Sequence, residues 1–145
     1  MILTFGQTGQ VATELGLQGG GPCLSRAEAD FKVPGALTAA LEAFRPEAVI
    51  NAVAYTAVDR AEDESDLANR VNGEAVSELA LACAAANIPL VHLSTDYVFD
   101  GAGTRPWQSD DPPAPLNVAG RSKTAGATAL SAAGGAPGST GGTWG

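Results

Sequence analysis

Short apolar runs alternate along the chain with stretches in which apolar residues recur every three or four positions. Four runs are expected to be strands, and the last two are apolar on both faces, as buried parallel strands are. They lie at residues 2–5, 22–25, 47–54 and 89–95. The helical pattern occupies residues 10–18, 33–44 and 61–86. Strands and helices that alternate at this spacing predict an α/β protein with a parallel sheet and right-handed crossovers.

The longest helical pattern, residues 61–86, is expected to form one continuous helix. The residues of its inner face recur at helical spacing and are Val71, Ala75, Leu79 and Ala82. Asn87 and Pro89 follow the last apolar position, and they should end the helix before the fourth strand begins.

The composition limits which kinds of molecule this protein is expected to bind. The chain has 145 residues, 45% of them hydrophobic, which suits one domain with a real core. A net charge of −8 argues against nucleic acid or an anionic membrane surface as a partner. No apolar run approaches a membrane span, and the first residues do not resemble a signal peptide. Cys23 and Cys83 lie far apart and form no metal-binding motif, so we expect reduced thiols and a cytoplasmic location, with a disulfide or a metal site as the alternative.

The end of the chain differs in character from the rest. Residues 124–145 carry no charged side chain, and six of the last twelve positions are glycine. Such a segment buries little apolar surface. We therefore expect a domain over residues 1–130, a disordered or loosely attached tail over residues 131–145, and a fourth strand followed by one more helix.

A glycine-rich turn follows the first predicted strand. In "FGQTGQVA", Gly6, Gly9 and Ala12 occupy the positions of a G-x-x-G-x-x-G/A dinucleotide loop, between a strand and a helix. The first glycine permits the tight turn and the second lets the backbone approach a pyrophosphate, which the helix N-terminus attracts. A purely structural turn is the alternative. The candidate cofactor-binding residues of this loop are Gly6, Gln7, Thr8, Gly9, Gln10 and Val11.

An acidic residue after the second strand of such a fold meets the adenosine half of the cofactor. Asp30 occupies about that place and Phe31 follows it, although Glu28 is also available and a solvated acidic loop is the alternative. Arg26 favours a 2′-phosphate, but the sequence does not decide between NAD and NADP.

A second polar segment, "STDYVFDG" at residues 94–101, follows the fourth strand. Thr95 and Tyr97 should therefore emerge at the carboxyl end of the sheet, where ligands bind in open α/β folds. Lys123 lies four residues after Ala119 on a predicted helix, so both face the same way.

Two further features have ordinary structural explanations. His92, the single histidine, lies inside an apolar strand and is expected to be a core residue with a satisfied ring nitrogen. The acidic run at residues 59–66 is expected to be the solvated first turns of a helix rather than a divalent-metal site.

The strings "FGQTGQVATEL", "PEAVINAVAYTAVDRAE", "ANRVNGEAV", "LVHLSTDYVFDG" and "PLNVAGRSKTAG" together resemble the extended short-chain dehydrogenase/reductases. Within that family the sequence is most similar to the dTDP-4-dehydrorhamnose reductases of dTDP-L-rhamnose biosynthesis. The strings run in family order over residues 1 to about 126. The resemblance implies a Rossmann-type, doubly wound sheet.

The resemblance also implies an oxidoreductase activity. The family transfers hydride from NADPH or NADH to the C4 ketone of dTDP-4-dehydro-L-rhamnose, using a threonine, a tyrosine and a lysine. The threonine falls on Thr95, the lysine on Lys123 and the tyrosine on Ala119, while Tyr97 would contact the substrate. Residues that would line the ribose side of the cofactor are Ala52, Ala54 and Tyr55, with Lys123 holding the ribose hydroxyls.

Ala119 is a departure from the family pattern. The alkoxide left by hydride transfer needs a proton, and a phenol supplies it when a nearby ammonium lowers its pKa. Alanine has no proton to give, and loss of a placed general acid costs about 10²–10⁴-fold in rate. We therefore expect impaired catalysis, with a non-catalytic cofactor-binding or regulatory module as the alternative.

Length is the second departure from the family. Its members continue through further strands and a C-terminal substrate-binding region, which this chain is expected to lack. The dTDP-sugar pocket would then be incomplete. The fourth strand would be left as an apolar edge that favours self-association.

Overall fold

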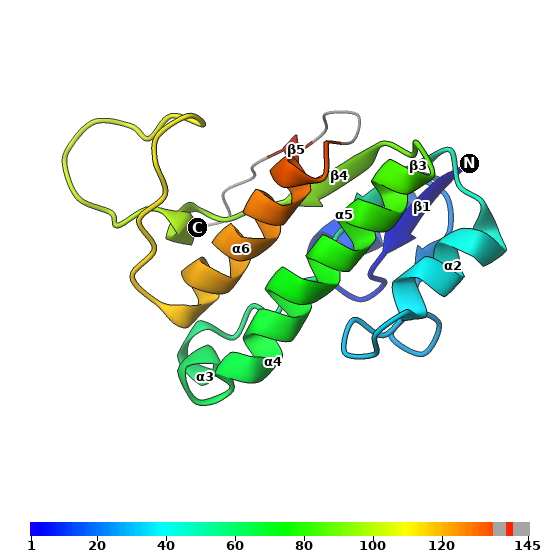
Figure 1. The fold of residues 1–145 in the computed structure, drawn as a ribbon, viewed down its shortest axis with the longest axis horizontal. Helices are drawn as coiled ribbons and strands as arrows, with labels where there is room; N and C mark the ends of the chain where they lie inside the picture. Colours follow the sequence, from blue (N-terminus) through cyan, green and yellow to red (C-terminus); the bar gives the residue numbers. More distant parts are fainter. Residues whose placement is uncertain (135–138, 141–145) are drawn as a thin grey trace.

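The computed structural model describes residues 1–134 and 139–140. Its strands form one parallel sheet in the order β2-β1-β3-β4-β5 (Figure 1). The strands are β1 (Ile2–Phe5), β2 (Cys23–Leu24), β3 (Ala48–Asn51), β4 (Leu90–Leu93) and β5 (Ser139–Thr140). The predicted α/β class with a parallel sheet is confirmed.

Helices follow the strands and form layers on the sheet. They are α1 (Gln10–Leu17), α2 (Ala36–Phe44), α3 (Val58–Asp63), α4 (Ser65–Asn69), the π-helical turn η1 (Arg70–Glu74), α5 (Ala75–Ala85), the 3₁₀ turn η2 (Asp96–Val98) and α6 (Val118–Ala132). Figure 1 shows α2, α5 and α6 side by side on one face. The chain moves in opposite directions before and after β2, so right-handed connections place α1 on the other face.

The strand order reverses between β1 and β3, and this fixes where a ligand can bind. The two strands pair over four residues, from Ile2 opposite Ala48 to Phe5 opposite Asn51. Fully buried side chains of these strands, Leu3, Phe5 and Val49, join the core. The connections leave β1 and β3 on opposite faces, so a crevice opens beyond their carboxyl ends.

The prediction of one continuous helix over residues 61–86 is wrong. The structure begins a helix earlier, at Val58, interrupts it at Glu64 (φ −114°, ψ 43°), and widens it to a π-helical turn over Arg70–Glu74. Of the predicted inner face, Val71, Ala75 and Leu79 are buried and Ala82 is partly buried. The apolar spacing identified the buried face but not the breaks in the backbone hydrogen bonding.

The end of the chain also differs from the expected disordered or loosely attached tail over residues 131–145. Residues 124–132 belong to α6, and the pair Ser139–Thr140 forms β5, which pairs with β4 at His92 and Leu93. The edge that was expected to favour self-association is therefore covered along the carboxyl half of β4. Within the predicted tail, residues 135–138 and 141–145 lie outside the described residues.

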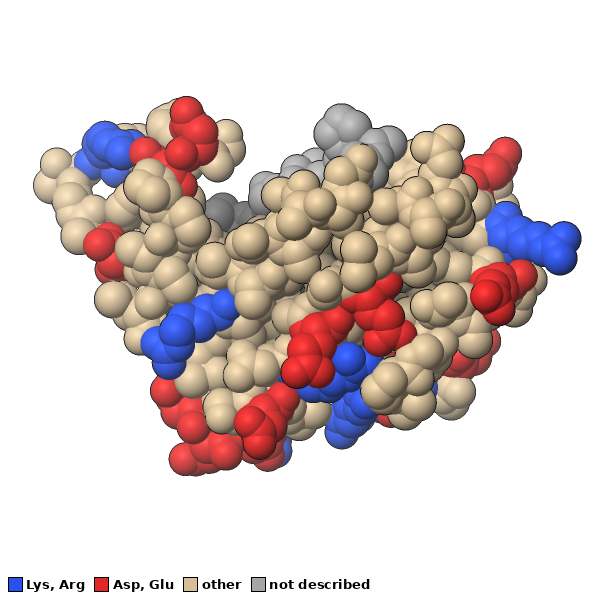
Figure 2. All heavy atoms as spheres, viewed as in Figure 1, with Lys and Arg blue, Asp and Glu red and all other residues tan. Residues whose placement is uncertain are grey.

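One concentration of negative charge lies over α3. Figure 2 shows acidic side chains gathered at the lower left of this face, where Figure 1 places α3. The exposed acidic residues there include Asp59, Glu62 and Asp63. This part of the predicted acidic run is the solvated first helix turns, as expected.

The packing of α6 yields a test of the fold. A Cβ at Gly126 would overlap the carbonyl oxygen of Asn72 and crowd Val76, so Gly126→Ala should destabilise the protein by about 1–3 kcal/mol. Gly16→Ala is the matched control, since its Cβ would meet only the Cys23 sulfur at 3.7 Å. That control should stabilise by about 0.5–1 kcal/mol through helix propensity. Urea unfolding measures both, and equal effects would contradict the packing described.

Candidate functional site

A cleft of about 1170 Å³ opens at the carboxyl ends of β1, β3 and β4. Every residue that the sequence nominated for a site lies along it, although their roles remain predictions. These residues are Gly6, Gln7, Thr8, Gly9, Gln10, Val11, Asp30, Phe31, Ala52, Ala54, Tyr55, Thr95, Tyr97, Ala119 and Lys123. The fold thus brings together segments that lie far apart in the sequence.

The glycine turn lies between β1 and α1 and forms one end of this cleft. Gly6 has φ +109°, and a Cβ there would lie 3.4 Å from the Ala52 carbonyl carbon, so this position needs glycine. Gly9 caps α1, and a Cβ there would meet no atom within 4 Å. No side chain caps the helix, so its first N–H groups are available to an anion.

Hydrogen bonds in the loop after β2 distinguish the two candidate carboxylates, Glu28 and Asp30. The Glu28 carboxylate accepts hydrogen bonds from the Ser25 backbone N–H at 2.8 Å and the Ser25 hydroxyl at 2.7 Å, and these bonds lower its pKa. Asp30 borders the cleft and accepts the Lys32 backbone N–H at 2.9 Å. Asp30 is therefore the better placed of the two to meet a ligand.

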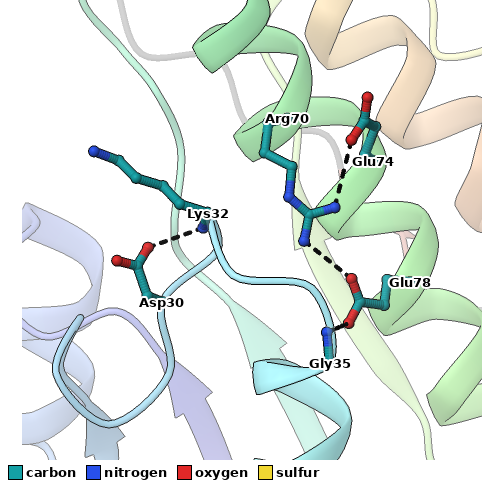
Figure 3. A network of polar contacts seen from close by, with 6 residues as sticks. All are labelled: Asp30, Lys32, Gly35, Arg70, Glu74 and Glu78. Carbon is teal, nitrogen blue, oxygen red and sulfur yellow. Dashed lines mark hydrogen bonds and ion pairs between the residues drawn. The ribbon is translucent and has the colours of Figure 1, made fainter.

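An ion-pair network fixes the segment that follows Asp30 (Figure 3). Arg70 in η1 pairs with Glu74 at 3.5 Å and with Glu78 at 3.1 Å. The second carboxylate also accepts the Gly35 backbone N–H at 2.5 Å, just before α2 begins. The network ties the loop that carries Asp30 to the helical layer.

Lys123 reaches from α6 to the end of β4. Its side chain is 7% exposed, and Nζ donates to the Leu93 carbonyl at 2.5 Å and lies 3.3 Å from His92 Nε2. Burial lowers the pKa of Lys123 to about 8. Burial, and then the nearby Lys123, lower the pKa of His92 to about 3, so the imidazole is neutral.

His92 is a buried core residue, as the sequence analysis expected. It is 2% exposed, and its Nδ1 lies 3.1 Å from Asn51 Nδ2. Asn51 ends β3 and accepts the Val53 N–H on its side-chain oxygen at 3.0 Å. A line of polar contacts therefore runs from β3 through β4 to Lys123.

Thr95 and Tyr97 follow β4 and face the same cleft. The Thr95 hydroxyl accepts the Tyr97 N–H at 3.3 Å and so begins η2, while Tyr97 is 49% exposed. Ala119, one turn before Lys123, is buried and presents only a methyl group. Thr95 thus brings a hydroxyl and Lys123 an amine to the cleft, while position 119 carries no polar side-chain atom.

Comparisons with known proteins agree with this arrangement. The profile of the family described as "RmlD substrate binding domain" matches residues 1–136. The chain belongs to this family. A dTDP-4-dehydrorhamnose reductase of Salmonella typhimurium is 42% identical over 137 residues, which cover 89% of this chain and 46% of the relative. One from Burkholderia thailandensis is 44% identical over 92% of this chain and 46% of its own length.

Solved structures of RmlD relatives share the fold. A dTDP-4-dehydrorhamnose reductase from Clostridium acetobutylicum superposes with a TM-score of 0.85 at 32% identity, covering 90% of this chain and 49% of that one. A reductase from Bacillus anthracis, solved in complex with NADP, gives 0.87 at 28% identity, covering 98% and 52%. The chain thus spans about half the length of the relatives it matches.

A buried residue that the sequence did not indicate, Asn72, helps to shape this candidate site. Asn72 in η1 is 1% exposed, and its side chain accepts the Tyr55 N–H at 2.8 Å and donates to the Tyr55 carbonyl at 3.1 Å. It also donates to the Ser122 hydroxyl at 3.0 Å. The one available signal was an asparagine directly beside Val71, on the apolar side of a predicted helix.

Two further residues that the sequence did not indicate, Arg60 and Glu64, line the cleft beside the predicted Tyr55. Tyr55 donates from its hydroxyl to the Glu64 carboxylate, which also pairs with Arg60 at 2.7 Å. The hydrogen bond to Glu64 raises the pKa of Tyr55, and the same bond lowers the pKa of Glu64. All three side chains line the cleft, so the acidic run contributes to its wall.

Within residues 1–134 and 139–140, no three histidine, cysteine or acidic side chains come together as a metal ion would require. In that same described part of the chain, no helix is both long and apolar enough to cross a membrane.

The burial of Lys123 predicts how stability depends on pH. Its pKa is about 8 in the folded chain against 10.5 ordinarily, so between these values the unfolded chain binds more protons. Stability should therefore rise with pH across that window. Lys123→Met should remove this rise and stabilise the protein at pH 7 by about 2–3 kcal/mol.

Lys32→Met is the matched control, because it replaces the other lysine of the chain at an exposed position. Urea unfolding at pH 7 and at steps from pH 8 to 10.5 measures the three proteins. A pH slope that survives in the Lys123 variant would show that this amine is not the group responsible.

Proposed function

We propose that this chain binds NADPH or NADH in the cleft at the carboxyl ends of β1, β3 and β4. The observation that carries the proposal is the glycine turn, in which Gly6 approaches the β3 backbone and Gly9 leaves open space before an uncapped helix. Backbone N–H groups at such a helix start bind a pyrophosphate. The Bacillus anthracis relative, solved with NADP, supports the same assignment.

The residues around the cleft suit the two halves of a dinucleotide. Asp30 would accept a hydrogen bond from the adenosine ribose, and Arg26 on the same wall would meet a 2′-phosphate where one is present. Asp30 and Arg26 both line the cleft, so we propose no preference between NAD and NADP. Lys123 would hold the ribose hydroxyls at the other half.

We also propose that the reaction belonging to this site is reduction of the C4 ketone of dTDP-4-dehydro-L-rhamnose, as the names of the relatives suggest. The reduced nicotinamide supplies hydride when it is bound. Thr95 would orient the ketone by a hydrogen bond to its oxygen, and Tyr97 would contact the sugar nucleotide. The chain spans about half of those relatives, so the whole activity is proposed for an assembled enzyme.

Ala119 favours a second candidate function for the chain itself. The general acid that the relatives' chemistry calls for is absent here, and the buried methyl group cannot replace it. Cofactor binding does not depend on this position, because the glycine turn and Asp30 lie elsewhere on the cleft. A cofactor-binding module with little or no turnover is therefore the second proposal.

We place the protein in the cytoplasm. Cys23 and Cys83 are both free thiols, and burial raises the pKa of Cys83 to about 11, which keeps it unreactive. Free cysteines are usual where thiols are kept reduced. The dinucleotide and the dTDP-sugar are the proposed partners.

Calorimetric titration with NADPH and with NADH tests the proposed cofactor binding. We expect saturable 1:1 binding to the 145-residue chain. Gly9→Ala should weaken cofactor binding at least tenfold, because the added methyl group would occupy the space proposed for the pyrophosphate. The methyl group would meet no protein atom within 4 Å, so the fold itself should not change. Gly16→Ala, a glycine of α1 away from the cleft, should bind as the unaltered chain does. No binding at millimolar cofactor by a folded chain would exclude the proposal.

Restoring the phenol separates the two candidate functions. The Ala119→Tyr chain, combined with the remaining half of the Salmonella relative, should reduce the keto sugar about 10²–10⁴-fold faster than the Ala119 chain in the same assembly. NADPH oxidation at 340 nm follows the reaction. If both assemblies bind cofactor and neither turns over, the module without turnover is the correct description.

A further inference from the structure

The charges around the cleft differ from those of the chain as a whole. The chain carries 16 acidic and 8 basic side chains, which give a net charge of −8. In the cleft the basic side chains are the more numerous. The charged residues that line it are Arg26, Lys32, Arg60 and Lys123, with Asp30 and Glu64. A cleft of net positive charge on an acidic protein concentrates anions from solution.

Half of these charged residues have no role in the proposed cofactor site. They are Lys32, Arg60 and Glu64. Lys32 belongs to the loop after β2, whereas Arg60 lies in α3 and Glu64 directly follows that helix, beyond β3. Two separate segments of the chain therefore contribute cations to the cleft that the cofactor does not account for.

Glu64 holds the Arg60 guanidinium at the cleft. One oxygen of the Glu64 carboxylate accepts a hydrogen bond from Arg60 Nη2 at 2.7 Å, and the other accepts one from the Tyr55 hydroxyl. Glu64 has φ −114° and ψ 43°, so the two charges do not form an ordinary pair along a regular helix face. Within residues 1–134 and 139–140, Arg60 Nε and Nη1 have no hydrogen-bond partner, and both can donate to a ligand.

Lys32 supplies the second cation. Its backbone N–H donates to Asp30, but its side-chain amine makes no hydrogen bond or ion pair in the part of the chain that the structure describes. Figure 3 shows this side chain extended away from the Arg70 network. Hydrogen bonds from Tyr55 and Arg60 lower the pKa of Glu64, and the charge of Lys32 contributes to the same shift. Lys32 and Arg60 therefore lie near the same carboxylate.

We propose that Lys32 and Arg60 form a second anion subsite on the exposed side of the cleft, which binds a phosphate group other than the pyrophosphate of the cofactor. A guanidinium offers parallel N–H donors that match phosphate oxygens, and an ammonium adds a compact charge. Glu64 does not oppose this binding, because both of its oxygens already accept hydrogen bonds. The glycine turn contributes none of these residues, so the subsite does not require bound cofactor.

The phosphate of this subsite has two possible sources with the same chemistry. One is the 2′-phosphate of a bound NADPH, and the other is the phosphate of a second ligand that enters the cleft beside the dinucleotide. Inorganic phosphate is a suitable probe for both, since it carries the shared group and nothing else.

Titration of the full chain with inorganic phosphate, without cofactor and at constant ionic strength, tests the proposal. Backbone amide shifts measured by NMR should saturate around Lys32 and Arg60 at millimolar phosphate. Arg60→Gln and Lys32→Gln should each weaken the binding by about threefold or more, because each removes one of the two cations. Arg45→Gln is the matched control, since it removes the same charge at an exposed position after α2 and outside the cleft.

Three results would overturn the proposal. They are the absence of saturable shifts, shifts confined to the glycine turn at residues 6–11, and unchanged phosphate affinity in both cleft variants when circular dichroism shows them to be folded. Lys32→Gln leaves the Arg60–Glu64 pair intact, so this variant decides the outcome if Arg60→Gln does not fold.

Repeating the titration with saturating NADH and with saturating NADPH identifies the source of the phosphate. Phosphate that binds beside NADH but not beside NADPH assigns the subsite to the 2′-phosphate, and phosphate that binds beside both assigns it to a second ligand. Displacement by NADH as well would place the phosphate at the pyrophosphate position and overturn the proposal. If neither dinucleotide binds, the proposed function fails, whereas the cofactor-free titration still decides whether the subsite exists.

Discussion

One buried amide, the side chain of Asn72, connects the loop after β3 to helix α6. Its oxygen accepts the Tyr55 N–H, and its nitrogen donates to the Tyr55 carbonyl and to Ser122. An apolar side chain there would leave buried polar groups without partners, each costing about 1–3 kcal/mol. Asn72 lies in a π-helical turn, a deviation that is common near functional sites. The loop after β3 and the helix that carries Lys123 are thus held in one arrangement.

Two buried asparagines, Asn51 and Asn72, position different parts of the candidate site. Asn72 joins the loop after β3 to α6, and Asn51 lies beside His92, which in turn lies 3.3 Å from the Lys123 amine. Neither depends on the side chain at position 119. The cleft therefore has the glycine turn and the Lys123 amine, but the side chain at position 119 is a methyl group and not a phenol. We therefore propose cofactor binding for the chain itself, and turnover only for an assembly in which the phenol is restored.

The sequence predicted the sheet well because buried parallel strands such as β3 and β4 are apolar on both faces, which few other elements are. It predicted the glycine turn because Gly6 must adopt a positive φ. It missed the break at Glu64 and the π-helical turn, since apolar spacing does not report backbone hydrogen bonds. The sequence predicted a helix around Lys123 but not its extent to Ala132, and in this helix Gly126 permits close contact with Asn72. Tertiary packing, rather than local sequence preference, determines the helical structure of that segment.

The central claim is that a dinucleotide binds at the carboxyl ends of β1, β3 and β4. Mapping backbone amide chemical shifts by NMR while NADPH is added tests it most directly, because it locates the ligand as well as detecting it. The account predicts saturating shifts for Gly6, Gly9 and Val11 in the turn and around Asp30, with the α2 and α5 surfaces unchanged. Shifts confined to other surfaces, or none at millimolar NADPH, would contradict it.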